Sequence, residues 1–370
     1  MKIAVLGAGA MGSLYGGMLF HAGHEVVLID VSEAHINAVN QKGLSIDGPE
    51  KQINVRVPAF LAPEIKGAFE LILLFTKTVY SRSALDSVKH LIGPDTWMLS
   101  LQNGLGNDTL IAEYLPQDRI IVGTTDFPST FVAPGEIRSR GTGTTKIMSA
   151  NGVYSDTVSK IADALNEGGF NCVVSEDVFV AIWEKVAFNS AMNAITATTR
   201  LKLGYVGASE EGRGAAFDVA REVISVANAK GIKADIDRVL AVMDKDFRDH
   251  SDHKPSMLQD VLQKRQTEVD FINGEGKRVG NVSLQSPSIA AFNANAAEAL
   301  ANATLAAAMG GDAERNFAGE TYYCQLKCHD PSGDDYYVTF TRKTVRISSY
   351  QDDAIRTAVE TWADAVPALA

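Results

Sequence analysis

The chain has 370 residues, of which 46% are hydrophobic and 21% are charged. These proportions are typical of a folded globular protein, and the length allows roughly two to three domains, so a disordered chain, a collagen-like fibre and a coiled coil are excluded. Asp and Glu (45) outnumber Lys and Arg (34), and the resulting net charge of −11 disfavours nucleic acid and anionic membrane surfaces as partners. Three cysteines argue against a disulfide framework and fit a reducing compartment.

The apolar N-terminus could be taken for a signal peptide, but glycines interrupt it repeatedly. A strand-like segment at 25–29 follows at the spacing of a βαβ unit. No other stretch reaches the roughly 18 uninterrupted apolar residues of a membrane span. We therefore expect a cytoplasmic protein.

Short apolar, β-branched runs alternate with helical patterns through the first half of the chain. Strands that are apolar almost throughout are typical of a parallel sheet buried on both faces. The pattern predicts a doubly wound α/β sheet with helices at 10–23 and 81–91. The expected strands are at 2–6, 25–29, 71–75, 97–101 and 119–122. Shorter Gly- and Thr-rich strands between 126 and 150 predict antiparallel additions at a sheet edge.

Long amphipathic runs from about residue 177 to 309 predict a largely helical second region. Its Ala-rich stretch at 290–308 is expected to be a packed helix. The last part of the chain changes character again, with strand-like runs, a turn and an amphipathic end. The expected elements of this tail are strands at 322–326, 336–341 and 344–348, a turn at 330–333 and a closing helix at 351–365.

The first expected strand leads into Gly-Ala-Gly-Ala-Met-Gly at residues 7–12, which matches the dinucleotide-binding fingerprint. Gly7 permits a tight turn, Gly9 lets the backbone approach a pyrophosphate, and Gly12 allows the helix to pack closely on the strand. The helix N-terminus, at Ala10 and Met11, favours the negative charge of the ligand. The motif alone could be a glycine-rich turn with no ligand, but it stands between a strand and a helix, as binding requires.

Asp30 stands at the end of the second expected strand, where a carboxylate would hydrogen-bond a ribose 2′-hydroxyl. Without the glycine motif, a solvated strand-end carboxylate would be the simpler interpretation. The 2′-phosphate of NADP would meet like charge here, and no Arg or Lys follows closely, although His35 could offset the repulsion if it were protonated. The sequence therefore predicts NAD as the preferred cofactor.

These features predict three parts. An α/β Rossmann-type N-terminal domain is expected at residues 1–175, and an all-helical substrate and catalytic domain at 176–309. A small α+β C-terminal extension of unknown role is expected at 310–370.

The segment 183–193 carries the clearest candidates for chemistry. Lys185, Asn189 and Asn193 are spaced by four residues and line one face of a helix whose other faces are apolar. A cation and two amides on a buried helix are costly unless they meet a polar partner or a ligand. A solvated polar stripe explains the same periodicity equally well.

Other polar residues stand where ligands bind in α/β proteins. Lys77 and Asn103 follow expected strands, at the carboxyl ends where open sheets bind their ligands. Ser256 begins a helix, and its hydroxyl could meet the same ligand as Glu268 although the two do not share a helical face. The cluster of Cys324, Cys328 and His329 has no second pair at metal spacing, so we interpret it as structural and predict no metal site.

Together these residues resemble the ketopantoate reductase (2-dehydropantoate 2-reductase) family. The matching pieces occur in the family's order and cover roughly residues 1–308. The glycine motif is generic to Rossmann proteins, whereas two pieces together are specific: 183–185 with Asn189 and Asn193, and the run from 256–260 through 267–274. The pieces are the motif at 7–12, Lys77, residues 102–106, 183–185 with Asn189 and Asn193, 256–260 and 267–274.

The resemblance implies a Rossmann domain joined to an all-helical domain, with the active site in the cleft between them. It implies that Lys185 is the general acid that protonates the C2 oxygen as hydride arrives, and that Glu268 supports the lysine and the substrate hydroxyl. The residues implied to bind substrate are Asn103, Asn189, Asn193 and Ser256, the last at the carboxylate. Lys77 and Asn103 are implied to lie beside the cofactor.

Two departures from the family stand out. The family commonly prefers NADPH and often has a basic residue near the end of the second strand, where this chain has Asp30. The resemblance to the family is therefore the one argument for NADP as the cofactor. The tail after about residue 309 has no counterpart in the family pattern, and could be an oligomerisation module, a regulatory domain or a fused segment.

The best hypothesis is a nicotinamide-dependent reduction of a 2-oxo acid to a 2-hydroxy acid, by resemblance 2-dehydropantoate to pantoate. The alternative enzyme is a D-2-hydroxy acid dehydrogenase that uses another 2-oxo acid. A regulator that senses a dinucleotide without turnover is a third hypothesis, but it would have no need of Lys185, Asn189, Asn193 and Glu268 together. The expected partners are the small-molecule substrate and a possible second copy of the chain.

Overall fold

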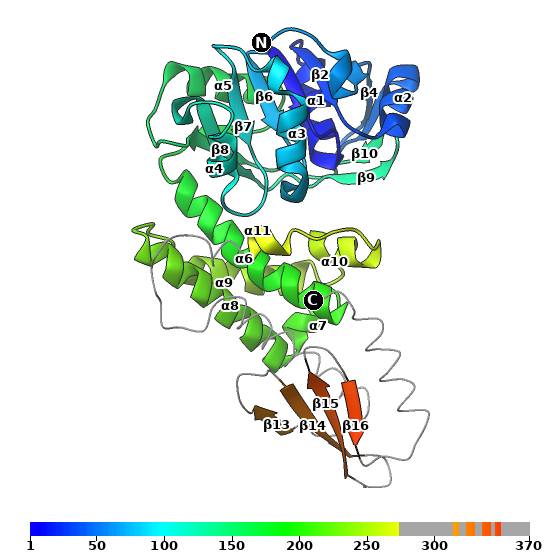
Figure 1. Ribbon diagram of the computed structural model, residues 1–370, viewed down its shortest axis with the longest axis vertical. Helices are drawn as coiled ribbons and strands as arrows, with labels where there is room; N and C mark the ends of the chain where they lie inside the picture. The colour runs from blue at the N-terminus through cyan, green and yellow to red at the C-terminus, as the bar shows by residue number, and fades with distance from the viewer. Residues whose placement is uncertain (274–313, 318–322, 330–334, 342–344, 349–370) are drawn as a thin grey trace. The chain divides into compact units, whose positions relative to one another are not determined.

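A computed structural model describes residues 1–273 and the backbone course of four later strands, at 314–317, 323–329, 335–341 and 345–348 (Figure 1). By their internal contacts the residues fall into two compact units. Unit 1 comprises 1–190, 220–241 and 266–283, and unit 2 comprises 191–219, 242–265 and 284–370. The domain limits expected from the sequence, at 175 and 309, stay predictions.

Unit 1 is built on an eight-stranded, mainly parallel sheet that confirms the predicted α/β class. Strands β1, β2, β6, β7 and β8 coincide with the five expected strands to within three residues at each end, and neighbours among them pair in parallel. In sheet order the strands are β12 (Cys172–Val174), β11 (Thr145–Ser149), β8 (Ile120–Thr125), β7 (Trp97–Ser100), β6 (Leu71–Leu74), β1 (Lys2–Leu6), β2 (Glu25–Ile29) and β5 (Ala59–Phe60).

Successive side chains of a strand point to opposite faces, so each strand contributes to two cores. In β1, Ile3 and Val5 join a core with residues of α1 and α5, whereas Ala4 and Leu6 join another with residues of α3 and α4. The helices of this region are α1 (Ala10–His21), α2 (Glu33–Lys42), α3 (Ser81–Ser87), α4 (Asn107–Ile111) and α5 (Asp156–Glu167). Short 3-10 turns are η1 (Ala62–Glu64), η2 (Thr78–Tyr80), η3 (Lys89–Leu91) and η4 (Gln117–Arg119).

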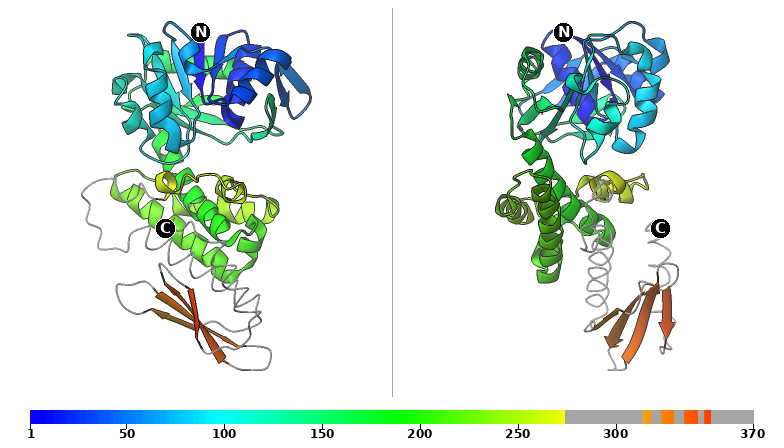
Figure 2. Two further views of the ribbon diagram at one scale, coloured as in Figure 1. Left: turned by 45° about the vertical axis from the view of Figure 1, so that its right-hand side comes forward. Right: turned by 60° about the vertical axis from the view of Figure 1, so that its left-hand side comes forward.

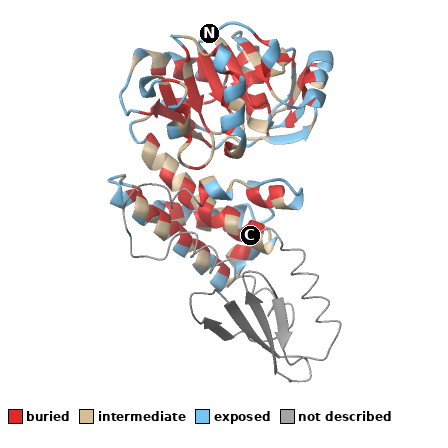
Figure 3. Cartoon of the chain, in the orientation of Figure 1, coloured by how far each residue is buried: buried red, intermediate tan, exposed pale blue. Residues whose placement is uncertain are grey.

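Figure 2 shows helices on both faces of this sheet, and Figure 3 shows its strands almost wholly buried. Burial on both faces is the reason that these strands lack polar alternation in the sequence. The loops that follow β1, β2, β6 and β7 carry, in that order, the glycine motif, Asp30, Lys77 and Asn103. All four lie at the carboxyl ends of parallel strands.

The segment 126–150 is placed only partly as expected. Strand β11 does extend the main sheet, antiparallel to β8. However, β9 (Thr130–Ala133) and β10 (Glu136–Arg138) leave that sheet and form a second one with β3 (Leu44–Asp47) and β4 (Gln52–Val55), in the order β4-β3-β10-β9. The pairing of β10 with β3 joins residues about ninety positions apart, which local sequence patterns do not reveal.

Within the region expected to be helical, 177–309, every element that the structure describes is a helix. Helix α6, with 22 residues, is the longest of the helices that the structure describes. The helices are α6 (Val178–Thr199), α7 (Leu203–Ala208), α8 (Glu210–Ala229), α9 (Ile236–Asp249), α10 (Ser256–Leu262) and α11 (Val269–Ile272). The expected Ala-rich helix at 290–308 lies outside the described residues.

The tail contains a four-stranded sheet in the order β13-β14-β15-β16, with every neighbouring pair antiparallel. Three of its strands match the expected ones, and the first was not expected from the sequence. The strands are β13 (Glu314–Phe317), β14 (Tyr323–His329), β15 (Asp335–Thr341) and β16 (Val345–Ser348). The expected turn at 330–333 and closing helix at 351–365 lie outside the described residues.

Among the residues that the structure describes, no helix is both long and apolar enough to span a membrane.

Candidate active site

The glycine loop has the geometry that the motif predicts. Gly7 has φ +93°, and a Cβ atom there would lie 2.6 Å from the backbone nitrogen of Thr76. A Cβ on Gly12 would lie 1.9 Å from the carbonyl oxygen of Gly7. A Cβ on Gly9, by contrast, would meet no protein atom within 4 Å. Two glycines therefore close the turn, and the third leaves open space at the start of α1, where a pyrophosphate could approach.

Asp30 follows β2, and its Oδ1 accepts the backbone N–H of Ser32 at 2.9 Å. The next side chain, Val31, is 92% exposed. His35 is buried, and both of its ring nitrogens face hydrogen-bond partners. Burial lowers the pKa of His35, against the opposing influence of the Asp30 carboxylate. Because Nδ1 accepts the backbone N–H of Gly135, it carries no proton, so the imidazole is neutral and does not supply the positive charge that could offset a 2′-phosphate.

Lys185 lies in the second turn of α6, and its Nζ donates a hydrogen bond to the carbonyl oxygen of Thr125 at 2.7 Å. Thr125 ends β8, so the amine is held at the carboxyl edge of the main sheet. Desolvation of the amine lowers the pKa of Lys185 to about 8, although the Asp126 carboxylate acts in the opposite direction. An amine with this pKa is mostly protonated at neutral pH and gives up its proton readily.

A buried network lies behind this carbonyl. The hydroxyl of Tyr15, on α1, donates to the Oγ1 of Thr125 at 2.9 Å and lies 2.6 Å from the Oγ1 of Thr145. The Tyr15 ring stacks on Phe170 with a centroid separation of 3.7 Å. Because the network is enclosed, it fixes the end of β8 and with it the acceptor of the Lys185 hydrogen bond.

Glu268, Asn103 and Lys77 come together around Thr78. The Oε1 of Glu268 accepts the backbone N–H of Thr78 at 2.8 Å. The hydroxyl of Thr78 donates to the carbonyl oxygen of Asn103 at 3.3 Å. Lys77 immediately precedes Thr78, at the start of η2. Residues from three distant parts of the chain thus meet at the carboxyl ends of β6 and β7.

In unit 2, Asn193 and Ser256 are neighbours: the Nδ2 of Asn193 lies 3.5 Å from the Oγ of Ser256. Asn193 is 3% exposed, so at this position the polar stripe of α6 is not a solvated one. Ser256 begins α10, as expected. Asn189, one turn before Asn193 on the same helix, is half-buried.

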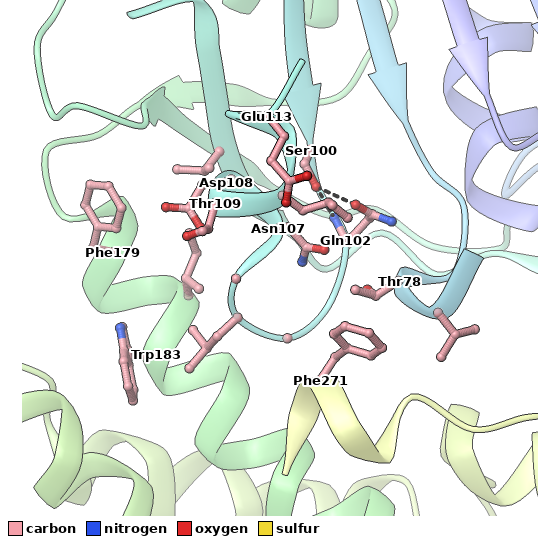
Figure 4. A pocket seen from close by; sticks show the side chains of 18 of the residues that line it. Thr78, Ser100, Gln102, Asn107, Asp108, Thr109, Glu113, Phe179, Trp183 and Phe271 are labelled. Carbon is pink, nitrogen blue, oxygen red and sulfur yellow. Dashed lines mark hydrogen bonds between the residues drawn. The ribbon is translucent and has the colours of Figure 1, made fainter. Parts of the chain in front are cut away.

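Unit 1 also contains a hollow of about 990 Å³, all of whose lining residues belong to that unit. Figure 4 shows the hydrogen-bonded pair of Ser100 and Gln102 at its wall, with Phe179 and Trp183 on α6. Thr78 lines the hollow, but Lys185, Asn103 and Glu268 do not. The hollow therefore adjoins the Thr78 junction without containing the candidate proton donor.

Within the described part of the chain, no group of three or more His, Cys, Asp or Glu side chains could hold a metal ion. Cys172 is a buried free thiol. Cys324, Cys328 and His329 lie on β14, whose side chains are outside the described residues. The candidate residues described above offer an amine, a carboxylate, amides and hydroxyls for carbonyl chemistry.

Comparison with known proteins decides the family. Residues 3–152 match the family model described as Ketopantoate reductase PanE/ApbA, and residues 177–308 match the model of its C-terminal part. The chain belongs to the ketopantoate reductase family. This membership confirms the predicted resemblance and the enzyme class, an oxidoreductase acting on a CH–OH group. Neither family model extends beyond residue 308.

Relatives within the ketopantoate reductase family include two named 2-dehydropantoate 2-reductase. The protein from Pyrococcus abyssi (strain GE5 / Orsay) is 37% identical over 296 residues, which cover 78% of this chain and 94% of that protein. The protein from Streptococcus pyogenes serotype M6 is 33% identical over 286 residues, covering 76% of this chain and 92% of that protein.

Solved structures give the same fold. The ternary structure of a D-mandelate dehydrogenase with NADH and anilino(oxo)acetate has a TM-score of 0.75 at 30% identity, covering 82% of this chain and 99% of that one. The PanE/ApbA family ketopantoate reductase from Ralstonia eutropha JMP134 has a TM-score of 0.73 at 28% identity, covering 82% and 99%.

Sequence reasoning missed three groups in or beside the candidate site. The Thr125 carbonyl that holds Lys185 is a backbone group, and no residue pattern reveals it. Thr78 could have been noticed beside Lys77, but its links to Glu268 and Asn103 are long-range. Ser13, in the first turn after the glycine motif, carries a buried hydroxyl that the motif does not require.

Proposed function

We propose that this protein reduces a 2-oxo acid to the 2-hydroxy acid with a nicotinamide cofactor, and that the substrate is 2-dehydropantoate. The observation that carries the proposal is the desolvated amine of Lys185, with a pKa of about 8 and a fixed carbonyl partner in a chain of this family. When bound, the reduced nicotinamide supplies the hydride for the carbonyl carbon.

Lys185 is the general acid of the proposed reaction. A lysine ammonium has three N–H donors, so the hydrogen bond to Thr125 leaves two for a substrate oxygen. As charge develops on the C2 oxygen, the ammonium stabilises it and transfers one proton, giving the hydroxyl of the product and a neutral amine. Glu268 supports the substrate hydroxyl and the lysine.

The amides and one hydroxyl hold the substrate. Asn103 and Asn189 are assigned to its oxygens, and Asn193 with Ser256 to its carboxylate. The support for the last pair is their 3.5 Å separation and the burial of Asn193, since a buried amide and hydroxyl so placed can both donate to one anion.

The dinucleotide is assigned to the glycine loop, with Asp30, Lys77 and Asn103 beside it. The residues that would hold it are Gly7, Gly9, Ala10, Met11, Gly12, Asp30, Lys77 and Asn103. The open space at Gly9 and the start of α1 fit a pyrophosphate. NAD is the proposed preference, because Asp30 can accept a hydrogen bond from a ribose hydroxyl but repels a 2′-phosphate, and His35 is neutral.

A D-2-hydroxy acid dehydrogenase with a different substrate is the second candidate. It is favoured by the likeness to a D-mandelate dehydrogenase at a TM-score of 0.75. The two candidates share the proton donor and the cofactor site, and they differ in the side chain of the oxo acid.

The test is a screen of NADH and NADPH oxidation with ketopantoate, pyruvate, 2-oxoisovalerate and phenylglyoxylate. The proposal expects the highest kcat/KM with ketopantoate. The highest value with phenylglyoxylate would establish the second candidate instead. Binding of cofactor without turnover of any oxo acid would overturn both and favour a dinucleotide-sensing regulator.

The domain limits, the oligomeric state and the cellular location are also proposed. We propose that residues 1–175 form the dinucleotide-binding domain and residues 176–309 the substrate domain, with 310–370 as an appended module. A homodimer and a cytoplasmic location complete the proposal. Sedimentation of the full chain and imaging of a labelled one are the measurements that check them.

A further inference from the structure

A buried histidine joins three segments around the glycine loop. His35 lies in the first turn of α2 and is 1% exposed. Its Nδ1 accepts the backbone N–H of Gly135 at 3.0 Å, in the turn between β9 and β10. Its Nε2 lies 3.2 Å from the Oγ of Ser13, on α1. The imidazole is thus held from both sides by groups of two other elements.

The directions of these hydrogen bonds follow from the number of protons. The Ser13 hydroxyl donates to the carbonyl oxygen of Ala8 at 2.7 Å, and a hydroxyl has only one proton to donate. Ser13 must therefore accept the second bond, from Nε2–H of His35. Because Nδ1 accepts from Gly135, the ring is the neutral tautomer with its proton on Nε2. A continuous relay runs from Gly135 through His35 and Ser13 to Ala8.

The end of the relay lies inside the dinucleotide motif. Ala8 stands between Gly7 and Gly9, so its carbonyl oxygen sets the orientation of the peptide that leads into Gly9. A second link comes from Ser129, the residue before β9, whose hydroxyl donates to the carbonyl oxygen of Ala10, the first residue of α1, at 2.8 Å. The segment 129–138 is therefore linked to the dinucleotide motif twice, once through the relay and once directly from Ser129.

We propose that His35 and Ser13 are positioning residues for the dinucleotide: their relay fixes the Ala8 peptide, so that the backbone at Gly9 is preformed for the pyrophosphate. The inference rests on the proposed function, because it takes the glycine loop as the cofactor site. Both side chains are buried, Ser13 at 0% and His35 at 1% exposed, so we assign neither to the surface that would meet the cofactor. Their removal costs affinity because the loop must then be ordered when the ligand binds.

The experiment measures NADH binding by isothermal titration calorimetry and thermal unfolding without ligand, on the full chain. The variants are Ser13→Ala, His35→Phe, the double variant and His35→Gln, whose amide can both accept and donate. His90→Phe is the control for loss of a histidine hydrogen bond: His90 bonds the backbone carbonyl of Ile65 and lies on η3, before β7, away from the glycine motif.

Ser13→Ala and His35→Phe are expected to raise the Kd for NADH about tenfold, the loss typical of one buried hydrogen bond. The double variant should be no weaker than the worse single one, since one relay is broken in each, and His35→Gln should recover most of the affinity. At saturating NADH, kcat should stay within about twofold of the wild-type value, whereas His90→Phe should leave Kd unchanged.

An unchanged Kd in Ser13→Ala, with or without a lower melting temperature, would overturn the inference and leave the relay a purely structural feature. Ser13→Ala removes a single oxygen atom, so it decides the matter even if His35→Phe does not fold. Failure of the wild-type chain to bind NADH or NADPH at all would instead overturn the proposed function.

Discussion

The glycine loop and helix α6 reach their functional geometry by different routes. In the loop, three glycines within six positions are enough to set the backbone geometry. A Cβ on Gly7 would collide with the backbone of Thr76, and a Cβ on Gly12 with the carbonyl oxygen of Gly7. On α6, Lys185 acquires a lowered pKa and a fixed position only through burial and through a carbonyl sixty positions earlier in the chain. Steric requirements of a backbone are therefore visible in a motif, whereas the reactivity of a side chain depends on its surroundings. The following predictions test that difference.

Removal of the amine should have the largest effect. Lys185→Ala is expected to lower kcat by about 10²–10⁴, the usual loss for a general acid. The Kd for NADH should change little, because the lysine is not assigned to the cofactor. Steady-state kinetics and calorimetry check both parts. Lys160→Ala, at an exposed position on α5, is the control, and near-wild-type turnover of Lys185→Ala would refute the assignment.

Cofactor choice should depend on Asp30. We expect kcat/KM with NADH to exceed that with NADPH by about tenfold to a few hundredfold, since repulsion of a 2′-phosphate is weakened by solvent. Asp30→Ala should bring the two values closer, mainly by improving NADPH. Asp118→Ala, at an exposed position on η4, should leave the ratio of kcat/KM with NADH to that with NADPH unchanged. A wild-type preference for NADPH would mean that Asp30 does not face the ribose.

Alanine substitutions should distinguish the crowded glycine of the loop, Gly12, from the open one, Gly9. Gly12→Ala places a Cβ 1.9 Å from a backbone oxygen, and overpacking of this kind should lower the free energy of unfolding by about 1–3 kcal/mol. Gly9→Ala meets no protein atom within 4 Å, so it should keep wild-type stability but lose about tenfold in NADH affinity. Denaturant titrations and calorimetry distinguish them. Wild-type affinity in Gly9→Ala would show that the ligand does not approach this position.

The pH profile should report the amine directly. Reduction requires protonated Lys185, so kcat/KM should be level below its pKa of about 8 and fall about tenfold per pH unit above it. The reverse oxidation needs the neutral amine and should rise over the same interval. Lys185→Ala should lose this inflection, and its persistence would assign the titration to another group.

Much of unit 1 could be predicted from local pattern. Strands β1 and β2 match the expected residues in full, because uniformly apolar runs between helical segments leave few alternatives to a parallel sheet. The start of α10 at Ser256 was also predictable, since Pro255 directly before it favours a helix start. The second sheet was not, because the pairing of β10 with β3 depends on segments far apart in the sequence.

The sequence by itself determined the glycine turn, the acidic end of β2 and the one-sided spacing of Lys185, Asn189 and Asn193, because these are properties of neighbouring residues on a strand or helix. Only the tertiary structure decided that Lys185 is desolvated against the Thr125 carbonyl and that Glu268 reaches Thr78. It also decided that His35 is buried and neutral, so that its ring carries no positive charge to pair with a 2′-phosphate. Protonation states and hydrogen-bond partners depend on burial and on atoms brought from distant parts of the chain, and no local pattern encodes either.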